Sequence, residues 1–229
     1  MQMIHDRFVN NDLLNFISRP QYEYSCSISA LTAVFNYLFS EQIGIKTSNE
    51  LAIIAAKKQA KDITGAGNLT IMKWFDILCK HYKLKGISKY YLRKENVTDW
   101  SKNSKVITDL KEVIRSKDKA FIYHMENHYN VIVGYFEHSD NPDEAYNTNA
   151  KLQRWIVLGE HSDYNPLNFP KIKNAIKVAL QKIDKEDLYN YTIESAMRTP
   201  IWTRKWRSIR HDLINSPNHC IMVFSKEEN

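Results

Sequence analysis

The strongest constraint on the fold is a change of hydrophobic pattern near residue 85 of a 229-residue chain. Before that point, apolar residues recur at helical spacing in three segments, which are residues 26–39, 49–60 and 69–84. After it come short runs rich in β-branched and aromatic residues, typical of strands, at 86–92, 119–125, 128–136, 152–160 and 219–226. A helical part followed by an antiparallel sheet predicts the α+β class.

We expect one domain over residues 1–229, with a helical subdomain over about 1–85 and a sheet subdomain over about 86–229. Flanking helices are predicted in the second part at 106–116 and, from a basic amphipathic pattern, at 171–183. Ser48 is the expected N-cap of the helix at 49–60. The polar stretch 138–151 predicts a long hairpin loop, and its 137–150 portion acts either as a lid or exosite or as a passive insertion.

The composition points to a globular chain kept in a reducing compartment. Hydrophobic residues make up 43% and charged residues 25%, and no apolar run approaches the ~20 residues of a membrane span. Three cysteines cannot all pair within one chain, and the N-terminus lacks the pattern of a signal peptide. We therefore expect reduced thiols and a cytoplasmic protein, with export without a cleaved signal, as for an effector, left open.

Cys26 is the candidate nucleophile. It stands at the predicted start of an apolar helix, where exposed N–H groups favour a thiolate. Gln21, five residues earlier, can supply a side-chain amide that joins the Cys26 N–H as an oxyanion donor. The alternative is a buried thiol that only packs, which is the interpretation we favour for Cys79 and Cys220.

A thiol nucleophile needs a base, and His128 at the entry of a predicted strand is the candidate. His124, four residues earlier, is its closest competitor. If strands 128–136 and 152–160 pair as a hairpin, the end of the second lies beside His128. Glu160 is then the expected orienting residue, with Asp163 and His161 as alternatives.

These segments resemble the papain-like cysteine peptidases, in particular the C39-like peptidase and phytochelatin synthase-like group. QYEYSCSISALTAVFNYL is similar to the family's nucleophile segment, HYNVIVGYF with RWIVLGEHSDYNP to its His block, and GAGNLTIMKWFDIL to the loop and helix between them. The resemblance implies a papain-like fold, with the Cys on the helical part and the His on the sheet. Two positions depart from the pattern: Ser27 replaces the usual Gly, and Gly159 stands where the family has its acid, with Glu160 next.

The resemblance implies a thiol hydrolase or acyltransferase acting on a peptide, isopeptide or γ-glutamyl amide bond. Cys26 would attack the carbonyl, His128 would activate the thiol and protonate the leaving amine, and Gln21 would help to stabilise the oxyanion. The expected substrate is a peptide, a protein or a glutathione-like thiol. No cofactor is expected, and the absence of a CxxC pair speaks against a structural metal site.

The rival hypothesis is a catalytically silent binding module. The segment 202–212 interleaves two Trp with four basic residues, which are Arg204, Lys205, Arg207 and Arg210. Such a pattern can bind nucleic acid or acidic partners. One short basic stretch in a chain of net charge +6 is more often a helix with buried Trp and solvated Arg, so nucleic acid is not the partner we expect. The sequence predicts no oligomeric state.

Overall fold

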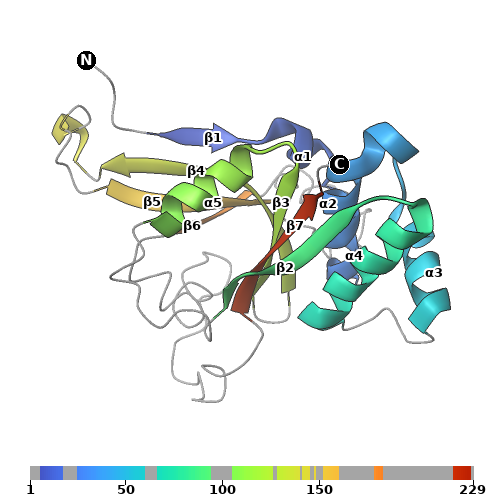
Figure 1. Cartoon of the computed structure of the whole chain (residues 1–229). Helices are drawn as coiled ribbons and strands as arrows, with labels where there is room; N and C mark the ends of the chain where they lie inside the picture. The colour runs from blue at the N-terminus through green and yellow to red at the C-terminus, as the bar shows by residue number, and fades with distance from the viewer. Residues whose placement is uncertain are drawn as a thin grey trace, which may run out of the picture.

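The computed structural model describes residues 6–17, 25–59, 66–93, 105–125, 128–139, 141–144, 147, 152–159, 178–182 and 219–227. Within these residues, seven strands form one antiparallel sheet, six of them in the order β2-β7-β3-β4-β5-β6. Their bounds are β2 Gly86–Arg93, β3 Lys119–Met125, β4 His128–Ser139, β5 Leu152–Gly159, β6 Val178–Lys182 and β7 His219–Lys226. Figure 1 shows helices packed on both faces of this sheet.

The larger core lies between the sheet and four helices. These are α1 (Asn11–Asn15), α2 (Cys26–Ile43), α3 (Ser48–Gln59) and α4 (Asn68–Tyr82). Residues from α2, α3 and α4 share one cluster with the side chains of β3, β4 and β7 that point to their face. Because α2 lies between the other helices and the sheet, most of its side chains from Ser27 to Phe39 are buried, including four polar ones, which are Ser27, Ser29, Thr32 and Asn36.

The opposite face of the sheet is covered by α5 (Lys105–Arg115). Leu110 and Ile114 of α5 pack against Phe121, Ile132 and Ile156 in a second, smaller cluster. A short strand, β1 (Arg7–Val9), pairs with β4 outside the main strand order. The next residue, Asn10, caps α1 by accepting a hydrogen bond from the Leu13 amide.

The α+β class is confirmed, and most predicted elements occur within a few residues of their expected bounds. The helix at 26–39 extends to Ile43, and the strand at 119–125 has the bounds expected of it. The hairpin of β4 and β5 is also confirmed, with Val131 opposite Gly159. No helix in the described ranges is long and apolar enough to cross a membrane.

Two predictions were wrong in detail. The helix expected over 171–183 is not formed at 178–182, which is strand β6 paired with β5. Ser48 is the first residue of α3 rather than its cap. The residue before it, Thr47, forms reciprocal hydrogen bonds with Glu50, the pattern of a capping box. The strand β1 was not predicted at all.

Candidate functional site

Cys26 lies where the sequence places it, at the first residue of α2. The helix has Ser25 as its N-cap, without a side-chain capping hydrogen bond and without an acidic residue in its first turn. Cys26 is half-buried, whereas Cys79 and Cys220 are buried. Burial, together with the negative charges of Asp76 and Glu227, raises the pKa of the Cys79 thiol to about 12. Cys26 is therefore the most accessible of the three thiols.

Tyr129 anchors the start of α4 and belongs to the core cluster against which Cys26 packs. Its hydroxyl lies 2.9 Å from the Ala66 carbonyl oxygen and 3.0 Å from Oδ1 of Asn68, the first residue of α4. Burial raises the pKa of Tyr129, and the nearby Cys220 and Cys26 thiols raise it further. Tyr129 therefore stays protonated at neutral pH.

His124 lies against Tyr129 on the sheet. The two rings stack with centroids 3.9 Å apart and an interplanar angle of 12°. The strand register pairs His124 with Tyr129 on one side and with Cys220 on the other. His124 is 4% exposed, so this imidazole is held in the core beneath the helix layer. We define the α2–α4 site as Cys26, Asn68, His124, Tyr129 and Cys220.

His128 is the first residue of β4 and is half-buried. It pairs with Met125, one position beyond the pair of His124 and Tyr129. Tyr129, Val131 and Val133 belong to the core under α2. Because side chains alternate along a strand, this register directs His128 to the opposite face. The role of His128 as the base for Cys26 stays a prediction, and His124 is the imidazole whose register faces α2.

The other predicted site residues lie outside the described residues. They are Gln21, Glu160, His161, Asp163 and the basic set Arg204, Lys205, Arg207 and Arg210. Within the described ranges, no three His, Cys, Asp or Glu side chains are grouped so that they could hold a metal ion. Tyr129 and Asn68 were not predicted from the sequence as site residues. Tyr129 occupies alternate strand positions with Val131 and Val133. This alternation indicates that Tyr129 is buried with them, but only once it is known which face of the strand is buried.

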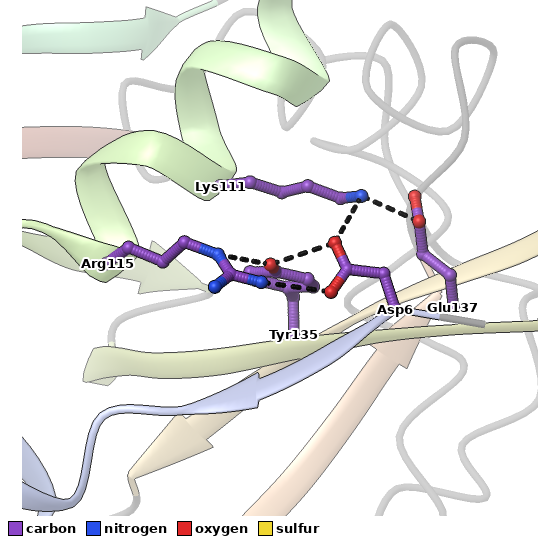
Figure 2. Close-up of polar contacts among 5 residues, drawn as sticks. All are labelled: Asp6, Lys111, Arg115, Tyr135 and Glu137. Carbon is purple, nitrogen blue, oxygen red and sulfur yellow. Dashed lines mark hydrogen bonds and ion pairs between the residues drawn. The ribbon is translucent and has the colours of Figure 1, made fainter. Parts of the chain in front are cut away.

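A second polar cluster joins β1 to α5 and β4 (Figure 2). Asp6 accepts hydrogen bonds from Lys111 at 3.0 Å, Arg115 at 2.9 Å and Tyr135 at 3.0 Å. Lys111 also bonds Glu137 at 2.6 Å, and the Arg115 Nε donates to the Tyr135 hydroxyl at 2.7 Å. Two cations therefore meet two carboxylates around one phenol.

The pKa shifts in this cluster work in opposite directions. Partial burial raises the pKa of Asp6, but hydrogen bonds from Lys111 and Tyr135 and the charges of Lys111 and Arg115 lower it below 3.8 overall. Burial raises the pKa of Tyr135, the Arg115 guanidinium opposes this rise and the Asp6 carboxylate adds to it, so that the pKa is about 12 overall. The cluster is therefore complete when Asp6 is ionised and Tyr135 is protonated.

We expect the contribution of Asp6 to stability to depend on pH in one direction. A carboxyl with a lowered folded-state pKa stabilises the protein above its unfolded pKa, near 3.8, and this stabilisation is lost as the pH falls through the folded value. Urea unfolding of the wild type and Asp6→Asn should therefore differ at pH 7 and converge below pH ~3.8. If the difference in unfolding free energy between the two proteins stays unchanged below that pH, the ion pairs of Asp6 are not its cause.

The comparisons with known proteins agree on one family. The family model of the basic immunoglobulin-like variable motif-containing protein matches residues 3–229. The human protein of that name is 28% identical over 225 residues, covering 92% of this chain and 43% of its own length. The Xenopus tropicalis relative is 32% identical over 165 residues, covering 66% of this chain and 33% of its own length. The chain thus spans less than half the length of these curated relatives.

The family assignment from the sequence motifs was wrong. A match over residues 3–229 overturns the resemblance to C39-like peptidases and phytochelatin synthases, which rested on three short motifs. The predicted hydrolase or acyltransferase activity, and the silent papain-like module offered as its alternative, are withdrawn with it, because neither the family description nor the relatives' names indicate either one. The chain belongs to the family of basic immunoglobulin-like variable motif-containing proteins.

Proposed function

We propose that the chain binds a small anionic ligand at the α2–α4 site and that Cys26 is the reactive group that meets it. The observation that carries the proposal is that two helix starts lie at one buried cluster. Tyr129 bonds Asn68, the first residue of α4, and belongs to the core cluster against which Cys26, the first residue of α2, packs.

Helix starts attract anions because their first N–H groups have no acceptor within the helix and the helix dipole is positive there. Neither α2 nor α4 has a side-chain capping hydrogen bond or an acidic residue in its first turn. Gly67, the N-cap of α4, is exposed, and a Cβ atom added there would meet nothing within 4 Å. A carboxylate or phosphate can therefore approach α4 from solvent.

The chemistry of the site limits the kind of ligand. Tyr129 is protonated at neutral pH because its pKa is raised, so it adds a neutral polar group rather than a charge. A ligand that carries a carboxylate and reaches a thiol suits this arrangement, and peptides and glutathione-like thiols are members of that class. The enzymatic part of the proposal goes no further than Cys26 as the reactive group. Three free cysteines agree with a reducing compartment.

The test compares two alkylating reagents that differ in charge. Iodoacetate carries a carboxylate and iodoacetamide is neutral, so the ratio of their rates at Cys26 reports local attraction for anions. Each helix start is worth about 0.3–1 kcal/mol to an anion. Two of them should raise the iodoacetate to iodoacetamide ratio about three- to thirtyfold over the ratio in urea-unfolded protein. Mass spectrometry of the digested protein follows each cysteine separately, with buried Cys79, outside the α2–α4 site, as the internal reference.

Gly67 offers a matched pair of control variants. Gly67→Asn and Gly67→Asp both place a capping side chain at the start of α4, but only Asp brings a negative charge. The backbone of Gly67 has φ −78°, which any residue adopts. We expect Gly67→Asp to lower the ratio well below that of Gly67→Asn. Equal ratios in native and unfolded protein, or equal ratios in the two variants, would count against an anion site.

A further inference from the structure

β1 occupies a stretch of the β4 edge that β3 leaves uncovered. β3 pairs with β4 from His128 to Ile132, and β5 occupies the other edge from Val131 to Ser139. β1 pairs with β4 at Gly134, Tyr135 and Phe136, so it continues the line of β3 along the same edge. In Figure 1 β1 lies beside β4, although the two strands are far apart in the sequence.

The main-chain contacts of β1 do not depend on its side chains. The Asn10 amide donates to the Val133 carbonyl at 2.7 Å, and the Glu137 amide donates to the Asp6 carbonyl at 2.6 Å. Gly134 makes the approach possible, because a Cβ atom there would lie 2.4 Å from the Phe8 carbonyl oxygen. An extended segment of another sequence can satisfy the same backbone groups, as strands added to sheet edges do.

Two side chains of β1 and its flank fit the surface beside this edge. Figure 2 shows the Asp6 carboxylate between Lys111 and Arg115 of α5, with Tyr135 of β4 below. The Phe8 ring lies 4.9 Å from the Arg115 guanidinium and 6.3 Å from the centroid of Tyr135. Cation–π contacts of this kind favour an aromatic ring at this position. We call Lys111, Arg115, Gly134 and Tyr135 the β1 socket.

The β1 socket requires an acidic occupant. Without Asp6, two cations face the single carboxylate of Glu137, which already bonds Lys111. Asp6 is the carboxylate that pairs with Arg115 among the described residues. An occupant without a carboxylate leaves net positive charge in a partly buried place, whereas one with a carboxylate restores the balance.

We propose that the β1 socket is a binding site for an extended segment of another protein that carries a carboxylate two residues before an aromatic residue. The segment lies antiparallel to β4 and replaces β1, which fills the site as a tethered internal ligand. β1 suits that role because it has three residues, of which Arg7 and Val9 are exposed. A partner then competes with β1, which leads directly into Asn10, whose side chain donates to the Tyr37 hydroxyl and the Ile114 carbonyl.

The test measures binding of a labelled peptide to the full chain by fluorescence anisotropy. The peptide has the sequence Asp-Arg-Phe-Val-Asn of residues 6–10 with uncharged ends. The variant Asp6→Ala/Phe8→Ala loosens the internal strand and leaves the socket intact. Removing the competitor should strengthen peptide binding by about tenfold or more relative to wild type, because the open fraction of the site sets the apparent affinity.

Two controls make the result specific. Adding Gly134→Ala to the loosened variant places a Cβ atom against the peptide backbone and should remove the gain. A peptide with Ala in place of Asp should bind about tenfold or more weakly, in line with a lost charge-assisted hydrogen-bond set. If circular dichroism shows that the double variant does not fold, Asp6→Asn, which keeps the side-chain shape, takes its place in the same comparison.

The proposal is overturned if the peptide binds no variant, or if Gly134→Ala leaves binding unchanged. Concentration-dependent dimerisation of the loosened variant, blocked by Gly134→Ala, would assign the site to strand exchange between two copies of this chain instead. The proposal is supported if the peptide binds the loosened variant most tightly, the wild type less tightly and the variant with Gly134→Ala least tightly.

Discussion

Replacing Phe75 with alanine is expected to lower the free energy of unfolding by about 3–5 kcal/mol, the usual cost of removing a buried aromatic ring. Phe75 is fully buried in α4. Its ring contacts Phe35 and Phe39 of α2, with centroids 6.0 Å and 6.1 Å away, and Phe224 of β7 at 5.1 Å. The cavity would therefore open between two helices and the sheet, where no single element can move to fill it.

Urea unfolding monitored by circular dichroism measures this effect, and two variants calibrate it. Phe75→Leu keeps most of the apolar volume and should cost about 1–1.5 kcal/mol. Leu69→Ala removes an apolar side chain from the same helix at a residue that is 70% exposed, and should change stability by less than about 0.5 kcal/mol. A cost for Phe75→Ala no greater than that of Leu69→Ala would show that this aromatic cluster does not hold the layers together.

The local spacing of apolar residues was sufficient to predict the helices and strands that are buried along their length. The strand at 119–125 and the helix that begins at Cys26 follow from apolar spacing alone, because the buried face repeats within each segment. The segment 178–182 shows where this reasoning fails. Its basic amphipathic pattern favours a helix, yet it pairs with β5, so a partner distant in sequence decides its backbone conformation.

β1 was missed for a related reason. Its three residues carry no periodic signal, and it forms because β3 ends before β4 does and leaves an edge to be paired. The cues for that strand were Asp6 and Phe8, but their partners Lys111 and Arg115 are more than a hundred residues away. Long-range ion pairs of this kind cannot be read from one sequence.

The candidate site could be predicted from the sequence only in part. The start of α2 at Cys26 followed from the apolar run behind it. Asn68 and Tyr129 could not be assigned, because their hydrogen bond joins residues 61 positions apart. The register of β3 against β4 also decides which imidazole faces α2, because a shift of one residue along a strand moves a side chain to the other face of the sheet. Sequence motifs place His128 in the site, whereas the pairing of β3 with β4 places His124 beside Tyr129.

Replacing Lys111 with methionine is expected to cost about 2–4 kcal/mol, somewhat less than the 3–5 kcal/mol of a fully buried ion pair. The Glu137 side chain is 8% exposed and the Lys111 side chain 20% exposed. Methionine keeps an unbranched apolar stem out to Cε but removes the ammonium from two carboxylates, those of Asp6 and Glu137. The cost therefore arises mainly from a carboxylate left in a poorly solvated place, and not from lost packing.

A second substitution separates these two causes. In the Lys111→Met background, Glu137→Gln removes the buried charge and should restore more than half of the lost stability, giving a large coupling energy in the double-mutant cycle. Lys80→Met serves as the matched control, because Lys80 pairs with Asp76 at 2.8 Å on the surface, with side chains 71% and 53% exposed. Its cost should stay below about 0.5 kcal/mol. If Glu137→Gln restores nothing, Lys111 stabilises the protein through its ammonium over the Tyr135 ring, 5.0 Å from Nζ to the ring centroid, and the ion pairs of this cluster contribute little to holding β1, α5 and β4 together.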